Sequence, residues 1–269
     1  MNASPLSSPE PWNLVAAAYA NEIVPMFEHY SAEALRLAKV PSGGAIVDVA
    51  AGPGTLSVLA ARAQHHVSAV DFSEEMVSQL RLRLDREQLT NVDVTVGDGM
   101  RLPYANGAFQ GAFSMFGLMF FPDRGRGFRE LHRVLADGAR AVVSSWLPLD
   151  RVPRLALALA ALRELLPPPP GTPPFAPPLA QRDECIAEMS AAGFRDVEVV
   201  EVTHESTAPS TKELWASMER TTAPLALAKS QFRERWKAVS RAIEDKLVAA
   251  FGDGPQPMRM PAFLTIGVR

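Results

Sequence analysis

The chain has 269 residues, of which 47% are apolar and 21% are charged, and its formal net charge is -3. This balance excludes disorder of the whole chain. It also argues against a general nucleic-acid-binding surface, because such a surface needs an excess of Lys and Arg to displace counterions. The single cysteine, Cys185, excludes an internal disulfide, and no Cys/His cluster has the spacing of metal ligands, so no metal is expected.

Two features of the sequence bear on location. The N-terminal residues Met1–Pro5 lack the basic and apolar regions of a signal peptide. The mostly apolar run Gly111–Pro122 has 12 residues, whereas a membrane-spanning helix needs about 20. We therefore predict a cytoplasmic protein with no membrane span.

Periodicity indicates helices first and then an alternation of strands and helices. Residues 1–10 are rich in Ser and Pro and are expected to fray. Between positions 11 and 40 apolar residues recur at three- and four-residue spacings, which predicts helix, and Pro25 divides this stretch into two helices. Short apolar runs then alternate with helical stretches, which is typical of parallel βαβ units, so we predict a doubly wound α/β fold. The expected strands are residues 45–50, 67–71, 92–96, 109–115 and 139–146.

After Trp146 the pattern is less regular. Residues 167–178 contain eight prolines in 12 positions, and this segment is expected to be a stiff, polyproline-like spacer. An apolar stripe at helical spacing is interpreted as core, with a pocket or a dimer face as the alternatives. The stripe consists of Phe232, Trp236, Val239, Ile243 and Leu247. The other expected elements are helices at 155–166, 179–192 and 212–251 and strands at 197–203 and 262–268.

The segment Val47-Asp48-Val49-Ala50-Ala51-Gly52-Pro53-Gly54-Thr55 is the most informative motif. Glycines between a strand and a helix let the backbone approach a ligand, and the helix N-terminus directs N–H groups at it. Asp71 ends the second strand, 23 residues after Asp48, where a carboxylate accepts hydrogen bonds from ribose hydroxyls. Asp98 ends the third strand, where it is placed to accept from an adenine amine while Met100 packs on the ring.

An NAD(P)-dependent oxidoreductase is the main alternative, because dinucleotide-binding enzymes share a glycine-rich turn between strand and helix. Their fingerprint is G-x-G-x-x-G, and here Ser57 occupies the third glycine position, which disfavours close packing of the helix on the strand. Asp48 also argues against this alternative, since its carboxylate would lie near a pyrophosphate. The sequence has no Walker-type Gly-Lys-Ser/Thr motif either.

At these strand ends the sequence resembles the class I S-adenosylmethionine-dependent methyltransferases, in particular the small-molecule group that includes ubiquinone/menaquinone-type and natural-product enzymes. The resemblance covers residues 12–146 and rests on Asp48–Gly54, Ala69–Met76 and Val96–Pro103. Two positions depart from the family pattern. Ala50 stands where the family usually has glycine, and Ala136-Asp137-Gly138 stands where it usually has Pro-Gly-Gly.

The resemblance implies a Rossmann-like methyltransferase sheet of seven strands, with N-terminal helices and a helical insertion after strand five. It divides the chain into an N-terminal helical lid region (1–40), a cofactor-binding core (41–150), a helical and Pro-rich insertion (151–180) and the remainder of the same domain (181–269). It also implies S-adenosyl-L-methionine as the cofactor. The implied cofactor-binding residues are Tyr19, Asp48, Ala50, Gly52, Gly54, Asp71, Phe72, Met76, Asp98, Gly99, Met100, Ser114 and Met115.

The implied reaction is in-line displacement that moves the cofactor's methyl group to an oxygen or nitrogen of a small-molecule acceptor. A non-catalytic S-adenosylmethionine-binding protein is the second alternative. No Asn/Asp-Pro-Pro-aromatic motif follows strand four, which argues against nucleobase methylation. Catalytic residues are unassigned apart from His29, the candidate base on the N-terminal helices. Tyr30, Phe120 and Trp146 are the candidate acceptor-binding residues, and a homodimer is left open.

Overall fold

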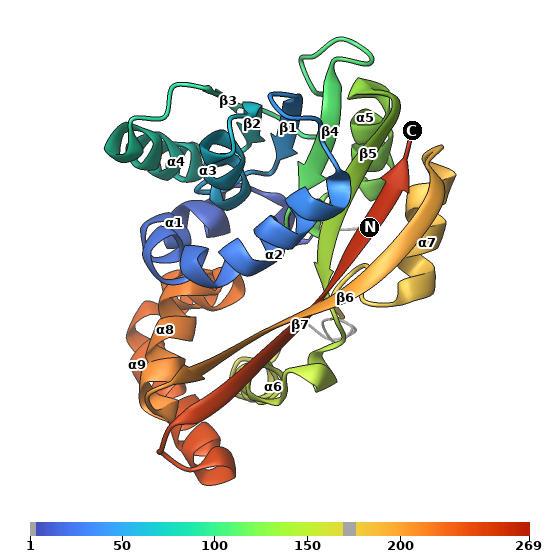
Figure 1. Cartoon of the computed structure of the whole chain (residues 1–269). Helices are drawn as coiled ribbons and strands as arrows, with labels where there is room; N and C mark the ends of the chain where they lie inside the picture. Colours follow the sequence, from blue (N-terminus) through green and yellow to red (C-terminus); the bar gives the residue numbers. More distant parts are fainter. Residues whose placement is uncertain (1–3, 169–175) are drawn as a thin grey trace.

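One mixed sheet of seven strands organises the protein (Figure 1). The computed structural model describes residues 4–168 and 176–269, so the predicted Pro-rich spacer lies largely outside the described residues. The strand order is β3-β2-β1-β4-β5-β7-β6, which confirms the predicted seven-stranded doubly wound fold. The strands are β1 (Ala45–Val49), β2 (His66–Asp71), β3 (Val92–Val96), β4 (Phe109–Ser114), β5 (Leu135–Trp146), β6 (Arg195–Ala208) and β7 (Gln256–Val268).

The first five strands pair in parallel, as the alternation of strands and helices predicts. The last strand does not follow that pattern: β7 lies between β5 and β6 and is antiparallel to both. Parallel strands bring their carboxyl ends to one edge of the sheet, which is where open α/β sheets bind ligands. The ends of β1, β2, β3 and β4 are therefore neighbours.

Helices cover both faces of the sheet because side chains alternate along each strand. On β1, Ile46 belongs to a buried cluster that includes residues of α2 (Val24–Ala38) and α3 (Thr55–Arg62), whereas Val47 belongs to the cluster that includes residues of α5 (Arg124–Val134) and α7 (Arg182–Ala191). All of β1 after its first residue is buried. The buried strand and its two helical layers hold the turn after Val49 in a fixed place.

The N-terminal segment is ordered, so the expectation that residues 4–10 fray is wrong. A 3-10 helix (Pro5–Ser7) follows Ser4, whose side chain accepts a hydrogen bond from the Leu6 N–H. The Trp12 indole N–H donates to the Leu6 carbonyl at 2.9 Å, and the Ser7 hydroxyl donates to the Phe120 carbonyl at 2.8 Å. These contacts tie the start of the chain to the loop after β4. The Ser7–Phe120 contact joins residues 113 positions apart, so no local pattern in the sequence predicts it.

Two helices follow, divided where the sequence predicts. The first is α1 (Glu10–Glu22), and α2 begins at Val24, so Pro25 lies in the first turn of α2. A proline is tolerated there because the first N–H groups of a helix have no partner within it. A serine caps the next long helix: Ser73 precedes α4 (Glu74–Glu87), and its hydroxyl accepts from the Met76 N–H at 3.1 Å.

A second helical cluster lies beside the outer ends of the long antiparallel strands β6 and β7 (Figure 1). It consists of α6 (Pro153–Leu165), α8 (Thr211–Thr221) and α9 (Ala223–Phe251), which pack around Trp215, Trp236 and Ile243. The interpretation of the C-terminal apolar stripe as core is confirmed for its four buried members, whereas Phe232 is half-buried. β6 and β7 extend beyond the predicted strands. The outer part of β6 is mostly polar, as its ion pair Glu205–Arg259 illustrates, and the outer part of β7 contains Pro257 and Pro261, which disfavour a strand prediction.

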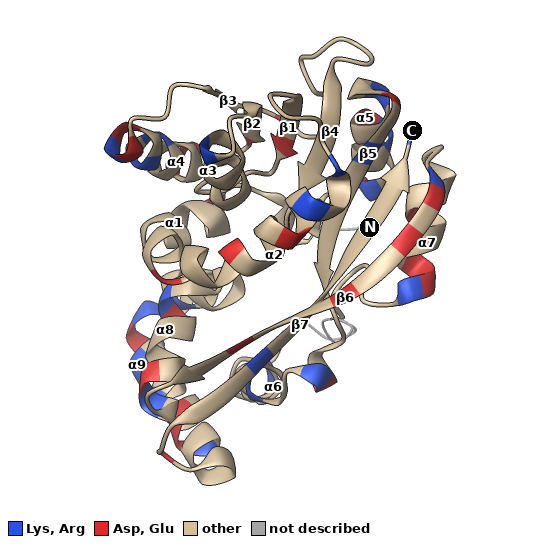
Figure 2. Cartoon of the chain, viewed as in Figure 1, with Lys and Arg blue, Asp and Glu red and all other residues tan. Residues whose placement is uncertain are grey.

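Charges of both signs alternate along the outer helices. In Figure 2, Lys and Arg are interspersed with Asp and Glu on α4, α7 and α9. Several of these side chains pair, as Arg124 does with Glu188. Within the part of the chain that the structure describes, no helix combines the length and the apolarity needed to cross a membrane.

Candidate cofactor and acceptor cavity

The carboxyl ends of the first four strands form the floor of a cavity of about 970 Å³, counting its open mouth. The N-terminal 3-10 helix, α1 and α2 supply the opposite wall through residues such as Ser7, Trp12 and Phe27. Each of the four strand ends contributes: residues 50–53 after β1, 71–72 after β2, 97–100 after β3 and 115–117 after β4. Segments far apart in the sequence thus meet at one site.

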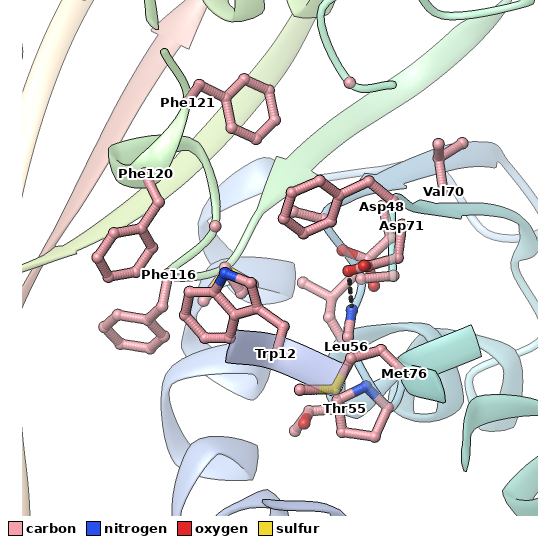
Figure 3. A pocket seen from close by; sticks show the side chains of 18 of the residues that line it. Trp12, Asp48, Thr55, Leu56, Val70, Asp71, Met76, Phe116, Phe120 and Phe121 are labelled. Carbon is pink, nitrogen blue, oxygen red and sulfur yellow. Dashed lines mark hydrogen bonds between the residues drawn. The ribbon is translucent and has the colours of Figure 1, made fainter. Parts of the chain in front are cut away.

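The turn after β1 brings backbone to the cavity. Gly52 has φ 55°, and its N–H donates to Asp71 Oδ2 at 2.8 Å, the contact that is dashed in Figure 3. Gly54 has φ 78° and lies behind the cavity, where an added Cβ would be 2.1 Å from Leu80 Cδ1. Gly54 therefore lets α3 start close to α4, and it is not among the lining residues.

Ala50, the departure from the family pattern, sits in a left-handed conformation with φ 57°. The methyl group of Ala50 fits because the residue that faces it, just after the end of β4, is a glycine, Gly117. A Cβ added to Gly117 would be 2.3 Å from the Ala50 Cβ, so only one of the two positions can carry a side chain. Ala50 lines the cavity, where its methyl group takes up space that a glycine would leave free.

We expect Ala50→Gly to stabilise the protein by about 0.5–1 kcal/mol, because the left-handed cost for alanine of about 1–2 kcal/mol exceeds the entropic cost of glycine. Urea unfolding of both proteins measures the difference. Ala51→Gly is the matched control: this neighbour has no positive φ, so glycine there should destabilise by about 0.4–1 kcal/mol. Equal destabilisation by both variants would contradict the strain at Ala50.

Asp71, at the end of β2, is 6% exposed and accepts two backbone hydrogen bonds. Gly52 N–H donates to one carboxylate oxygen and Ser73 N–H to the other, each at 2.8 Å. Burial raises the pKa of Asp71 to about 6, although these N–H donors lower it. A carboxylate has about four acceptor positions, so two remain for a ligand. The Ser73 hydroxyl also donates to Asn13 Oδ1 at 2.6 Å, which joins α1 to this corner.

Asp48, near the end of β1, is 1% exposed and only half satisfied. The Ser57 hydroxyl donates to Asp48 Oδ2 at 2.7 Å, whereas Asp48 Oδ1 has no partner. Burial raises the pKa of Asp48 to about 7 against the lowering effect of the Ser57 hydrogen bond. Ser57 occupies the third position of the dinucleotide fingerprint, so the residue that spoils that fingerprint has a function here: it orients an acid that faces the cavity.

The end of β3 supplies a second acidic corner. Asp98 is exposed, and its Oδ1 accepts from the Met100 N–H at 2.8 Å, which leaves Oδ2 free. Gly99 is required by packing, because an added Cβ would be 2.5 Å from the Phe121 ring and 2.7 Å from Val49 Cγ1. Phe72 is 36% exposed, unusually high for a large apolar side chain, and it lines the same cavity.

The opposite side of the cavity is aromatic. Figure 3 shows Trp12, Phe116, Phe120 and Phe121 on one side and the carboxylates of Asp48 and Asp71 on the other. The cavity lining therefore divides into a polar, acidic part and an aromatic part.

Phe116 is held in place from several directions. It has φ 57°, a rare conformation for a bulky residue, and its N–H donates to Ser144 Oγ at 2.7 Å. Its ring stacks on Trp146, with centroids 4.0 Å apart and planes 18° apart. Phe27 of α2 contacts both rings, with its centroid 4.7 Å from that of Phe116 and 5.5 Å from that of Trp146. Trp146 thus supports the aromatic wall from behind and is not among the lining residues.

The structure brings most of the sequence-predicted residues to this cavity but not all. Ser114 is fully buried below it, where its hydroxyl accepts from the Leu118 N–H at 3.0 Å. Tyr30 is also buried, and its hydroxyl donates to the Met260 carbonyl. Neither lines the cavity. The predicted residues that do line it are Tyr19, Asp48, Ala50, Gly52, Asp71, Phe72, Met76, Asp98, Gly99, Met100, Met115 and Phe120.

His29, the candidate base, is not brought to the cavity. It is exposed on α2, with its ring 5.7 Å from that of His204. Phe27 and Ser31, two residues before and after it, face the cavity instead, so His29 lies on another side of the helix. None of the described residues that line the cavity is His, Lys or Arg.

The lining residues that sequence reasoning missed include Trp12, Phe27, Ser31 and Phe116. Phe27 and Ser31 are one helical turn apart, a spacing that places them on one face of α2, but nothing local shows which face meets the sheet. Phe116 lies in the stretch from which Phe120 was selected. Its left-handed backbone decides where its ring points, and no residue type in the sequence indicates that conformation.

The strand order 3-2-1-4-5-7-6, the turn after β1 and the acids at three strand ends define the class I methyltransferase fold. Residues 46–138 match the family described as methyltransferase domain. For these residues the match supports the predicted likeness to the class I S-adenosylmethionine-dependent methyltransferases and, with it, S-adenosyl-L-methionine as the cofactor. The matches give no support to the NAD(P)-dependent alternative.

Individual proteins are similar to this chain in sequence or in fold. The demethylmenaquinone methyltransferase of Listeria welshimeri is 32% identical over 111 residues, which are 40% of this chain and 47% of that relative. The chain thus spans about half the length of the curated relatives it matches. Among solved structures, YcgJ of Bacillus subtilis has a TM-score of 0.61 at 18% identity and covers 90% of this chain and 98% of its own. The [4+2]-cyclase SpnF has a TM-score of 0.63 at 17% identity, with 100% of this chain and 98% of its own covered.

Proposed function

We propose that this protein transfers the methyl group of S-adenosylmethionine to a small aromatic acceptor. The observation that carries the proposal is the division of one cavity into an acidic part, with Asp48, Asp71 and Asp98 at three strand ends, and an aromatic part. The cyclase of similar fold shows why the cavity must carry the argument, since one fold supports several reactions.

The residues of the acidic part fit the cofactor. Asp71 keeps acceptor positions for two ribose hydroxyls, Asp98 Oδ2 is free to accept from the adenine amine, and Asp48 Oδ1 is a buried acceptor without a partner. Phe72 and Met100 supply apolar surface beside Asp71 and Asp98 for the adenine ring. When bound, S-adenosylmethionine supplies an electrophilic methyl group on a sulfonium sulfur.

The chain's own contribution to the reaction is orientation and exclusion of water. An aromatic wall attracts a sulfonium cation through the ring quadrupole and presents a flat surface to an aromatic acceptor. Holding two reactants in near-attack geometry lowers a barrier by up to about 7–11 kcal/mol. The name of the relatives, demethylmenaquinone methyltransferase, supports an acceptor with a ring system.

Apart from the three carboxylates assigned to the cofactor, the described lining offers no general base for a neutral alcohol. Burial and the neighbouring charge of Asp71 raise the pKa of Tyr19, so its hydroxyl keeps its proton at neutral pH. We therefore infer an acceptor that arrives already nucleophilic, either an uncharged amine or a phenol acidic enough to ionise in water. No step is assigned to His29.

The test is formation of S-adenosylhomocysteine in the presence of S-adenosylmethionine and one acceptor at a time. Ring acceptors (anilines, acidic phenols and hydroquinones) should give acceptor-dependent product, and choline-like or phosphorylated aliphatic amines should give none. Turnover restricted to the charged aliphatic compounds would contradict the proposed acceptor class.

The lining and the cysteine also bear on the partner and the location of the protein. A small molecule rather than a nucleic acid is supported by a cavity whose described lining has no cation. A cytoplasmic location is supported by a single cysteine, which is buried and free. The homodimer remains a prediction.

A further inference from the structure

Two serine hydroxyls, rather than strand carbonyls, hold the loop that follows β4. The pairing of β4 with β5 ends at Ser114 and Val143, so the loop N–H groups beyond it take other partners. Ser114 Oγ accepts from the Leu118 N–H at 3.0 Å, and Ser144 Oγ accepts from the Phe116 N–H at 2.7 Å. Both serines are fully buried. Side chains of β4 and β5 therefore fix the first turn of this loop.

Phe116 is held at two points by one face of β5. Ser144 binds its backbone, and Trp146 stacks on its ring. Side chains two residues apart on a strand point to the same face, so Ser144 and Trp146 act from the same side. Ser145 lies between them and points to the other face, where its hydroxyl donates to the Leu179 carbonyl at 2.7 Å. Because β5 pairs with β4 on one side and β7 on the other, this support is part of the sheet itself.

The bond to Ser144 matters because the backbone of Phe116 is left-handed, with φ 57°. In that conformation the Cβ of a bulky residue lies too close to its own backbone, so it persists only where the surrounding structure fixes it. Without the hydroxyl, the Phe116 N–H would be buried and unpartnered in this conformation, and other backbone conformations would be favoured. The direction of the Phe116 ring thus depends on a side chain of the neighbouring strand.

We propose that Ser144 is a positioning residue for the methyl acceptor: it fixes the left-handed backbone of Phe116 and thereby the ring that this residue contributes to the aromatic wall. The proposal rests on the proposed function, in which the aromatic part of the cavity receives the methyl acceptor. Ser144 is not among the lining residues, so it acts through Phe116. The carboxylates assigned to the cofactor lie at the ends of other strands, β1, β2 and β3. The effect of Ser144 should therefore fall on the methyl acceptor and not on the cofactor.

The kinetic test measures S-adenosylhomocysteine formation by the full chain with one ring acceptor at saturating S-adenosylmethionine. Ser144→Ala should lower kcat/KM for the ring acceptor by about tenfold, chiefly through KM, and should change the affinity for S-adenosylhomocysteine in calorimetry by less than about twofold. Ser145→Ala, which removes a buried hydroxyl from the other face of β5, is the matched control and should change neither quantity. In a Phe116→Ala background, Ser144→Ala should cause no further loss, because the ring that it positions is gone.

A spectroscopic test needs no methyl acceptor. The Phe116 ring stacks on Trp146, so its ring current shifts the Trp146 indole N–H signal in a ¹H–¹⁵N correlation spectrum. Phe116→Ala gives the position of that signal without the ring. Ser144→Ala should move the signal toward this position, and Ser145→Ala should leave it where the wild type has it. The signals of Trp215 and Trp236, which lie in the second helical cluster, are the internal references.

The outcomes separate the claims. A wild-type protein that forms no S-adenosylhomocysteine with any ring acceptor contradicts the proposed function. An unmoved Trp146 signal in Ser144→Ala overturns the positioning of Phe116, whether or not the protein turns over. If the signal moves but kcat/KM for the ring acceptor is unchanged, or if the affinity for S-adenosylhomocysteine falls as far as kcat/KM does, the role of Ser144 toward the methyl acceptor is wrong. An equal loss with and without the Phe116 ring would show that Ser144 acts by another route.

Discussion

Replacing Asp71 by asparagine is expected to weaken S-adenosylmethionine binding by about 100-fold or more, because hydrogen bonds to a charged group contribute about 1.5–3 kcal/mol each. The carboxylate already accepts from Gly52 and Ser73 N–H groups, one on each oxygen. Asparagine keeps one acceptor oxygen and turns an NH₂ group toward the other N–H. It therefore loses both a loop contact and an acceptor for the ribose hydroxyls.

Calorimetric titration measures this loss, and thermal unfolding shows whether the variant keeps its fold. Asp93→Asn is the matched control, since Asp93 is an exposed acid on neighbouring β3 that does not line the cavity. It should bind the cofactor as the wild type does. Wild-type affinity in Asp71→Asn itself would remove the ribose assignment.

Cofactor affinity should also fall by about 100- to 1000-fold between pH 7.5 and pH 5, since both cavity acids must give up a proton to bind. Burial raises the pKa of Asp48 to about 7 and that of Asp71 to about 6 in the free protein. Below these values the free protein holds protons that the cationic ligand and the ribose hydroxyls displace. Binding therefore releases protons, and acid weakens it.

Calorimetry in buffers of different ionisation enthalpy measures the released protons directly. In Asp48→Asn the dependence should shrink to the part due to Asp71, with its midpoint near pH 6. A pH-independent affinity in the wild type would show that neither acid changes its protonation on binding. The variant thus separates the contributions of the two carboxyls.

The free energy of unfolding of the free protein changes with pH in the opposite direction to the cofactor affinity. Both folded pKa values lie above the ordinary aspartate value of 3.8, so between about pH 4 and 7 the folded chain binds more protons than the unfolded chain. These two carboxyls therefore stabilise the free protein as the pH falls through that window. Acid should thus favour the free fold while it disfavours the complex.

The fold and the acidic half of the site were predictable because they depend on local patterns. A short apolar run before Asp48 or Asp71 predicts a strand that ends in an acid, and parallel pairing then brings the two acids together without further information. Two serines of the site can also be recognised locally. Ser57 stands at a fixed position of the glycine motif and bonds to Asp48, and Ser73 stands directly before the acidic first turn of α4, which it caps.

The aromatic half could not be predicted because it depends on long-range packing. Phe27 faces the cavity only because α2 lies with Ala34 against β1, and Phe116 does so only because its backbone is left-handed and its ring stacks on Trp146. The antiparallel β7 also breaks the parallel pattern of the first five strands, and Pro257 and Pro261 in its outer part disfavour the strand prediction that would have given its full length.

The central claim is that the cavity is built for S-adenosylmethionine, and its most direct test is calorimetric titration of the purified chain with S-adenosylmethionine, S-adenosylhomocysteine and NADH. We predict binding of the first two with release of protons at pH 6.5, and no binding of NADH. Binding of NADH without either sulfur ligand would contradict the assignment of all three strand-end acids.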